Sequence, residues 1–437
     1  MNITTMSQAN GKDAVSISGF TKDQTAAYDE LVKFINDDYD EVNYKRALTG
    51  PAGTGKTYLI RALIKNCKIP YASIGLSAPT HKACRVLQES INLPNIKVHT
   101  LQSDLGLRLN FDIEKFDLNR LSFDPKGKIK IGDYRIYIID EASMIPRGLV
   151  MFIEKLAKQH KTKIIYIGDA SQLSPVDEKY SSAFRSTKTY QLKEIVRQGI
   201  NNPISKLLEL LRYDIEHKSY EFLNYIYKNR YAFNEDNTKG YMVCNTEEFN
   251  KAVIINFNDE EFTKNVDLTK IVSYTNVSVN SWNNIIRSNI IKDSDKSILT
   301  KHDLIISYTT IVDTFNDPII KNSEEYIIND IVNYTHPKYG MKGFMVKFQA
   351  IHGGKITQPI FIVDHSDSYS IQLYVKISNN LVETAKSAPA TTRSTRWKEY
   401  FEFKEQHLLL TNVINNMGQI LYSRDLDYGF ALTSHKS

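Results

Sequence analysis

The chain has 437 residues, of which 42% are hydrophobic and 24% are charged, a composition typical of a folded protein with a sizeable core. Its 55 basic and 50 acidic residues give a formal net charge of +5, which neither requires nor excludes a polyanionic partner. The sequence has no signal-peptide pattern and no apolar run near the roughly 18 residues that span a bilayer. We therefore expect a cytoplasmic protein that does not enter a membrane.

The N-terminal segment, residues 1–18, is polar, and we expect it to form a flexible arm. The cysteines Cys67, Cys84 and Cys244 are odd in number and far apart, so their spacing indicates neither a disulfide framework nor a zinc site. A reducing compartment fits this pattern best.

The first stretch that carries chemistry is the glycine-rich loop GPAGTGKT, which fits the phosphate-binding pattern G-x-x-x-x-G-K-[ST]. An expected strand, residues 44–49, precedes it, and an expected helix with one apolar face follows it. In such a loop the backbone N–H groups surround phosphate oxygens, the lysine reaches the β- and γ-phosphates, and the final hydroxyl binds Mg²⁺. A glycine-rich loop with an incidental lysine is the alternative. The expected ATP-binding residues are Gly50, Pro51, Ala52, Gly53, Thr54, Gly55, Lys56 and Thr57.

Two further apolar runs predict buried parallel strands that end in polar residues. The run at 136–139 is followed by Asp140 and Glu141, and the run at 164–167 leads into GDASQL, which contains Gln172. Asp140 would hold the Mg²⁺ shell, Glu141 would polarise the attacking water, and Gln172 would sense the γ-phosphate. Taken alone, the Asp-Glu pair would also suit a helix N-terminus.

Six motifs now stand in order along the chain: GPAGTGKT, APTHKA (78–83), VHT (98–100), DEAS (140–143), GDASQL (168–173) and EIVRQ (194–198). Their order and spacing resemble the serial motifs of superfamily 1 helicases, in the branch that contains RecD and Dda. The resemblance implies an α/β fold with two RecA-like P-loop NTPase motor domains. It also implies an ATP-dependent DNA helicase that moves 5′ to 3′ on single-stranded DNA and unwinds duplex DNA.

The resemblance assigns roles outside the phosphate loop. FTKDQ (20–24) resembles the adenine-reading glutamine motif, which would put Gln24 on the adenine edge, although a solvated glutamine is the alternative. Arg197 would be an arginine finger on the γ-phosphate, or else a helix-end cation. For His81 and His99, a structural role is the alternative to nucleic-acid contact. The implied nucleic-acid contacts in this half are Pro79, Thr80, His81, Lys82, His99 and Thr100.

The first motor domain, residues 19–200, should contain a hairpin insert at residues 104–133, where apolar and polar residues alternate around an Asp-Pro-Lys-Gly turn. The family carries a strand-separating pin here. Phe123 and Ile129 are the candidate wedges against the duplex fork. A hairpin that packs only on its own domain is the alternative.

Residues 201–437 are expected to form the second motor domain. The stretch at 270–287 resembles its first strand and helix, which would place Thr275 and Asn276 on the nucleic-acid backbone and Trp282 in the core. A strand-rich stretch at about 300–385 suits an SH3-like β-barrel insert. The basic and aromatic stretch TTRSTRWKEYFEFKEQH could stack bases along a helix or form a packing face.

The last residues resemble the start of the family's fifth motif, T-x-H-K-[SA]-Q-G, and imply nucleic-acid contacts at Thr433, Ser434 and His435. No sixth motif follows, so a truncated or split helicase that needs a C-terminal completing fragment is a second hypothesis. A non-translocating ATP-dependent nucleic-acid-binding protein is a third. The expected cofactors are ATP and Mg²⁺. The expected partners of a monomer are single-stranded DNA, a duplex fork and a replication or recombination protein. Richness in Ile, Asn, Lys and Tyr is typical of an AT-rich genome such as a phage's.

Overall fold

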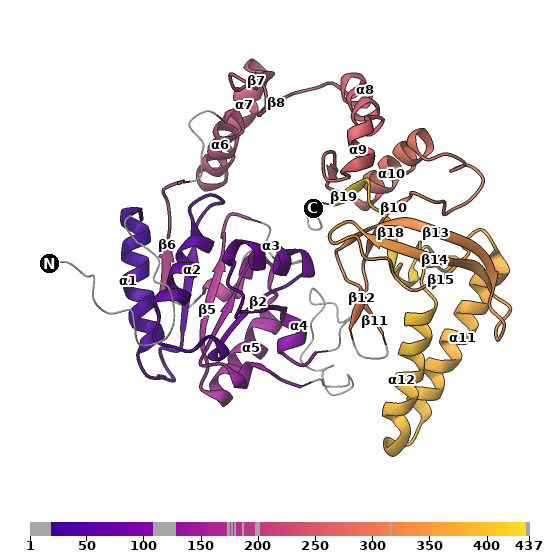
Figure 1. Ribbon diagram of the computed structural model, residues 1–437, viewed down its shortest axis with the longest axis horizontal. Coiled ribbons are helices and arrows are strands. Elements are labelled where there is room, and N and C mark those ends of the chain that lie inside the picture. The colour runs from indigo at the N-terminus through magenta and orange to yellow at the C-terminus, as the bar shows by residue number, and fades with distance from the viewer. Residues whose placement is uncertain are drawn as a thin grey trace. The chain divides into compact units, whose positions relative to one another are not determined.

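The computed structural model describes residues 19–107, 128–172, 175, 178, 181–185, 188–196, 202–313 and 317–433. The chain divides into two compact units, Met1–Asn245 and Thr246–Ser437 (Figure 1). We expected a domain boundary near residue 200, and this division instead groups residues 202–245 with the first unit. None of the described helices is long and apolar enough to cross a membrane. The expected N-terminal arm lies outside the described residues.

A six-stranded parallel sheet forms the centre of the first unit, with the strand order β3-β2-β4-β5-β1-β6. The strands predicted before GPAGTGKT, DEAS and GDASQL are its β1, β4 and β5. Both β4 and β5 are buried along their whole length, as parallel strands are when both faces of a sheet are covered. The strands are β1 (Lys45–Thr49), β2 (Ile74–Ala78), β3 (Val98–Thr100), β4 (Ile136–Ile139), β5 (Lys163–Gly168) and β6 (Lys188–Gln191).

Successive side chains of the central strands point to opposite faces of this sheet. Ile138 and Ile165 pack with apolar residues of α1, α2 and α3 in one core cluster. Tyr137 and Tyr166 pack with those of α5 in a second cluster. The helices are α1 (Lys22–Asn36), α2 (Lys56–Asn66), α3 (His81–Ile91), α4 (Leu101–Asp104) and α5 (Arg147–His160), followed by α6 (Pro203–His217), α7 (Glu221–Lys228) and the hairpin of β7 (Tyr231–Phe233) and β8 (Gly240–Met242).

The second unit combines a five-stranded antiparallel sheet, in the order β15-β14-β13-β10-β18, with a short parallel pair of β9 and β19. Two further hairpins join β11 to β12 and β16 to β17. The strands are β9 (Ile271–Ser273), β10 (Leu304–Ser307), β11 (Ile311–Val312), β12 (Pro318–Ile320), β13 (Glu325–Thr335), β14 (Lys342–Ala350), β15 (Ile360–Val363), β16 (Val413–Ile414), β17 (Ile420–Tyr422), β18 (Leu426–Tyr428) and β19 (Ala431–Thr433).

The β-rich stretch that we expected to continue to about residue 385 ends at Val363, because a helix occupies its last part. Asp367 caps this helix by accepting a hydrogen bond from the Ser370 N–H, and apolar residues of the helix pack in a core that contains the buried Tyr374. Figure 1 shows α11 and α12 running side by side. The helices of this unit are α8 (Thr246–Phe257), α9 (Glu260–Lys264), α10 (Asn276–Ile290), α11 (Ser368–Ser387) and α12 (Ala390–Gln406).

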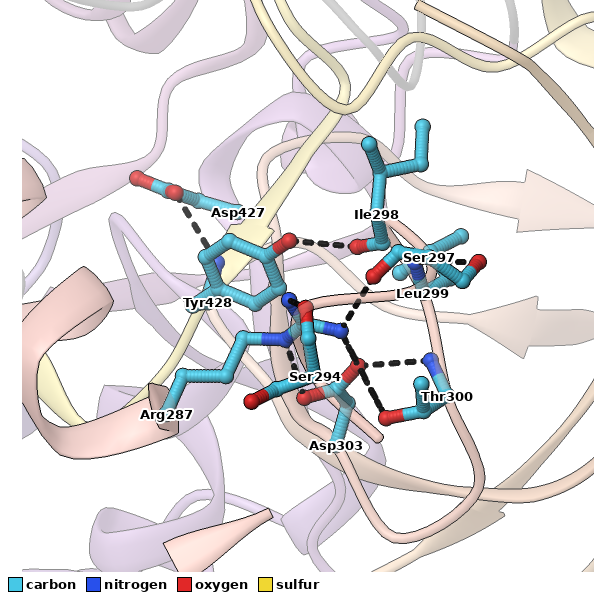
Figure 2. Close-up of polar contacts among 9 residues, drawn as sticks. All are labelled: Arg287, Ser294, Ser297, Ile298, Leu299, Thr300, Asp303, Asp427 and Tyr428. Atoms are coloured by element: carbon cyan, nitrogen blue, oxygen red, sulfur yellow. Dashed lines mark hydrogen bonds and ion pairs between the residues drawn. The ribbon is translucent and has the colours of Figure 1, made fainter. Parts of the chain in front are cut away.

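A buried ion pair fastens α10 to the antiparallel sheet (Figure 2). The Arg287 guanidinium donates from Nε to Asp303 Oδ1 at 2.7 Å and from Nη2 to Oδ2 at 3.0 Å. It also donates to the carbonyl oxygens of Ser294 and Ser297, both at 2.9 Å, and lies 5.0 Å from the ring centroid of Tyr428 on β18. One side chain therefore joins the end of α10, the loop after it, the residue that directly precedes β10, and β18.

Candidate functional site

The phosphate loop lies between β1 and α2, at the carboxyl edge of the parallel sheet, as its sequence predicted. Gly53 and Gly55 have φ angles of 86° and 78°, in the region that favours glycine. A Cβ on Gly55 would also lie 2.5 Å from the Gln24 amide nitrogen. The loop therefore depends on Gly55 for both its backbone conformation and its contact with α1.

Lys56, the first residue of α2, turns its ammonium group back over the loop. Its Nζ donates to Gly50 O at 2.6 Å and to Pro51 O at 3.0 Å. Burial lowers the pKa of Lys56, and three nearby carboxylates, those of Asp169, Asp140 and Glu141, act in the opposite direction. The structure thus gathers the predicted lysine and the predicted acid pair at one place.

Asp140 and Glu141 follow β4 in an unusual local conformation. Glu141 has a φ of 51°, so a residue other than glycine adopts the left-handed backbone conformation. This form of backbone strain is concentrated at functional sites. Burial raises the pKa of both carboxyl groups, and the Asp140 charge raises that of Glu141 further. The Lys56 ammonium acts in the opposite direction on both. The site therefore carries an excess of buried carboxylate that a cation would stabilise.

The oxygen donors expected to hold Mg²⁺ are chemically suited to that ion. Asp140 accepts one hydrogen bond, from the Glu141 N–H at 2.9 Å, which leaves a carboxylate oxygen available, and Thr57 supplies a hydroxyl from the start of α2. Over the described ranges no group of three or more His, Cys, Asp or Glu could hold a metal ion. Mg²⁺ usually takes one or two protein carboxylates and keeps phosphate and water as its other ligands, so binding of Mg²⁺ by Thr57 and Asp140 stays a prediction.

Gln24, which the glutamine motif predicted to lie on the adenine edge, lies against the phosphate loop. Its side chain is buried, donates from Nε2 to Thr54 O at 2.8 Å and accepts the Thr21 N–H at 2.9 Å as part of a capping box. Both ends of the amide therefore bind groups of the first unit, so the solvated alternative does not describe this residue. Contact with adenine stays a prediction.

The loop after β5 contributes a carboxylate that sequence reasoning did not assign to the site. Asp169 is buried and is the first of the carboxylates that act on the Lys56 pKa. It follows a buried parallel strand just as Asp140 does, and that position was the available signal. Gln172 is exposed, and its N–H donates to Asp169 O at 3.1 Å. The predicted sensor is therefore on the same loop as Asp169.

The predicted arginine finger, Arg197, lies outside the described residues. The chain directly before it is held at the phosphate loop, because the Val196 N–H donates to Gly53 O at 2.9 Å. A role for Arg197 in catalysis stays a prediction.

The expected nucleic-acid contacts of the first unit come from two neighbouring strands. In the pair of β2 and β3, Ala78 lies opposite Thr100, so the loop of Pro79, Thr80, His81 and Lys82 meets His99 and Thr100 at one edge. Thr80 and Thr100 cap α3 and α4 by accepting N–H groups, and the His99 imidazole lies 3.1 Å from the buried Asp104 carboxylate. These contacts give Thr80, Thr100 and His99 structural roles. Binding of nucleic acid by these residues stays a prediction.

The second unit repeats this arrangement with β9 and β19. Ser273 lies opposite Thr433, which brings Thr433 close to the exposed Thr275 and Asn276 that follow β9. Thr275 caps α10 by accepting the Ser278 N–H at 3.2 Å. Ser434 and His435 lie outside the described residues. Trp282 is partly buried and packs against the core, as expected.

The hairpin expected at 104–133 falls largely outside the described residues, and so does Phe123. Ile129 is described and packs, partly buried, against the core cluster of α5, which agrees with a segment packed on its own domain. In α12, Trp397, Tyr400 and Phe401 contact one another and are partly buried. This arrangement agrees with the packing face.

Comparisons with known proteins find distant relatives. Residues 21–225 match a family described as an AAA domain. The chain is 24% identical to an uncharacterized protein of Acanthamoeba polyphaga mimivirus, over 95% of this chain and 90% of that protein. It is 26% identical to the ATP-dependent DNA helicase dda of Enterobacteria phage T4, over 65% of this chain but only 60% of that helicase. Among solved structures, the Pif1 helicase from Candida albicans matches 96% of this chain and 85% of its own, with 16% identity and a TM-score of 0.43. The chain thus has a distant similarity to ATP-dependent DNA helicases.

Proposed function

We propose that this protein is an ATP-dependent DNA helicase that hydrolyses MgATP, moves along single-stranded DNA in the 5′-to-3′ direction and separates duplex strands. The observation that carries the proposal is the convergence of Lys56, Asp140 and Glu141 beside the glycine-rich loop. The similarity to the phage T4 helicase supports the choice of DNA as the substrate. The direction of movement rests on the resemblance of the motifs.

The residues of the loop suggest how ATP would bind. Phosphate oxygens would compete with Gly50 O and Pro51 O for the Lys56 ammonium, which already points over the loop. The N–H groups at the start of α2 favour negative charge there. Thr57 and Asp140 would hold Mg²⁺, which when bound would neutralise charge on the phosphates.

Glu141 is the candidate for orienting and polarising the attacking water. Its pKa is raised by burial and by Asp140, which brings the carboxylate closer to the range in which a general base works well. Lys56 counteracts this rise and keeps the group ionised more easily. The opposed influences leave a basic carboxylate next to the phosphate loop.

The nucleic-acid contacts proposed for the two units are hydroxyl, imidazole and ammonium groups at strand ends. Such groups bind the phosphate backbone and do not read base sequence. We therefore expect binding to single-stranded DNA that varies little with sequence and weakens as salt concentration rises.

The test is ATP hydrolysis by the full chain with and without single-stranded DNA, compared with a Lys56→Ala variant. DNA should stimulate hydrolysis by the wild-type protein, and the variant should show little activity in either condition. If DNA had no effect on a measurable rate of hydrolysis, the proposal of a DNA-driven motor would fail. DNA-stimulated hydrolysis without strand displacement would instead indicate a non-translocating DNA-binding ATPase.

A further inference from the structure

Three separate segments meet at the start of α1. The phosphate loop contributes Gly53 and Thr54, α1 contributes Asp23 and Gln24, and the third segment is residues 192–196, which follow β6. The side chains of Asp23 and Gln24 join these segments by hydrogen bonds to backbone groups, so the contacts depend on these two side chains and on the placement of the chain.

Asp23 makes the contacts that are most specific to this junction. Its Oδ2 accepts the Lys193 N–H at 2.6 Å and the Glu194 N–H at 3.3 Å, while its Oδ1 accepts the Thr21 hydroxyl at 3.0 Å. Hydrogen bonds from N–H groups to a carboxylate are roughly twice as strong as those between neutral groups. One carboxylate thus holds two consecutive amides of the third segment.

The other two contacts close the junction on the phosphate loop. The Val196 N–H donates to Gly53 O at 2.9 Å, and the Gln24 amide donates to Thr54 O at 2.8 Å. Movement of the phosphate loop would therefore strain or break its hydrogen bonds to α1 and to residues 192–196.

We propose that Asp23 is a positioning residue for ATP hydrolysis, because it holds residues 193–196, which directly precede the expected arginine finger Arg197 in the sequence, against the phosphate loop. This inference rests on the proposed function, because it assumes that the chain hydrolyses ATP and that Arg197 takes part.

The pKa of Asp23 supports this geometry. The Lys193 N–H is the largest influence on it, and together with the other hydrogen bonds it lowers the pKa of the carboxyl group below its ordinary value. Asp23 is therefore a carboxylate at neutral pH, which is the form that accepts both amides.

The molecule offers a matched control on the same helix. Glu30 also joins α1 to the strand β6, since its carboxylate lies 2.5 Å from the Lys188 ammonium and accepts the Tyr190 hydroxyl at 3.3 Å. Among the described residues, Glu30 has its hydrogen bonds and its ion pair with Lys188 and Tyr190 and none with residues 193–196. Glu30→Ala thus removes one acid and one connection between α1 and β6, but leaves the junction at the phosphate loop intact.

The experiment compares Asp23→Ala, Asp23→Asn and Glu30→Ala in the full chain. We expect Asp23→Ala to lower the kcat of DNA-stimulated ATP hydrolysis by about 10- to 100-fold, as small misplacements of catalytic groups do. Asp23→Asn keeps an acceptor without the charge and should fall between Asp23→Ala and wild type. Glu30→Ala should stay within about twofold of wild type. Binding of a fluorescent ADP analogue should change by less than about threefold in all three variants.

Hydrogen exchange supplies a readout that does not depend on catalysis. The amides of Lys193 and Glu194 should exchange faster in Asp23→Ala and at the wild-type rate in Glu30→Ala. Unchanged kcat in Asp23→Ala would overturn the inference, and so would a parallel loss of kcat, ADP affinity and melting temperature, which indicates general unfolding. A wild-type chain without ATPase activity would refute the proposed function, whereas an active wild type with an equally active Asp23→Ala variant refutes this inference alone.

Discussion

Replacement of Arg287 by methionine should destabilise the second unit strongly. The change keeps an apolar stem but removes the guanidinium, which leaves the fully buried Asp303 with only the Thr300 N–H and hydroxyl as donors. It also removes the donor to the carbonyl oxygens of Ser294 and Ser297. Loss of one partner of a buried ion pair costs about 3–5 kcal/mol of the free energy of unfolding.

Urea denaturation followed by tryptophan fluorescence measures this loss directly. The chain has 2 tryptophans, Trp282 and Trp397, and both belong to the second unit, so the signal reports on that unit. With a urea m-value of about 2 kcal/mol per M, the expected loss lowers the midpoint of the transition by about 2 M.

Two controls make this prediction sharper. The double variant Arg287→Met/Asp303→Asn removes both charges and should be more stable than Arg287→Met alone, because no carboxylate is left unpaired. The pKa of Asp303 is already raised by burial and lowered again by Arg287, so without Arg287 it should rise further. The penalty in Arg287→Met should therefore shrink as the pH falls and Asp303 takes up a proton. A loss below about 1 kcal/mol, or a double variant less stable than the single one, would refute the reasoning.

Three further changes test other parts of the structure. Gly55→Ala forces a φ of 78° on alanine and a clash with Gln24, so affinity for a fluorescent ADP analogue should fall by about tenfold or more; unchanged binding would contradict the role of this glycine. Glu141→Gln should keep nucleotide binding but lower kcat by about 10²–10⁴-fold. Because the pKa of Glu141 is raised, the loss of wild-type ATPase activity with decreasing pH should begin at a higher pH than for an ordinary glutamate. Burial lowers the pKa of His407 to about 4. Because the unfolded chain takes up this proton at higher pH, the free energy of unfolding should fall by up to about 3 kcal/mol between pH 6.5 and pH 4. His407→Phe should flatten this part of the plot of unfolding free energy against pH, and an unaltered slope would contradict the assignment.

The centre of the first unit could be predicted because its signals are local. Parallel strands covered on both faces are apolar throughout, so β4 and β5 stood out in the sequence, and GPAGTGKT marked the turn into α2. The acid pair Asp140 and Glu141 could be placed beside Lys56 because carboxyl ends of parallel strands meet at one edge.

Contacts between distant segments could not be predicted in this way. Asp23 binds amides about 170 positions away in the chain, and nothing in FTKDQ indicates a backbone partner. Glu141 has a left-handed φ directly after β4, and its residue type does not indicate this conformation. The strand-rich stretch was expected to continue to about residue 385, but residues from Ser368 onward form α11, whose buried Tyr374 packs against Phe403 of α12.

Strand displacement by the full chain tests the central claim most directly. The substrates are two duplexes that differ only in whether the single-stranded tail is 5′ or 3′, each with MgATP and with Lys56→Ala as the control. The account predicts ATP-dependent displacement from the 5′-tailed duplex and none by the variant. Failure of the wild-type chain to displace either duplex, although it hydrolyses ATP in response to single-stranded DNA, would contradict it.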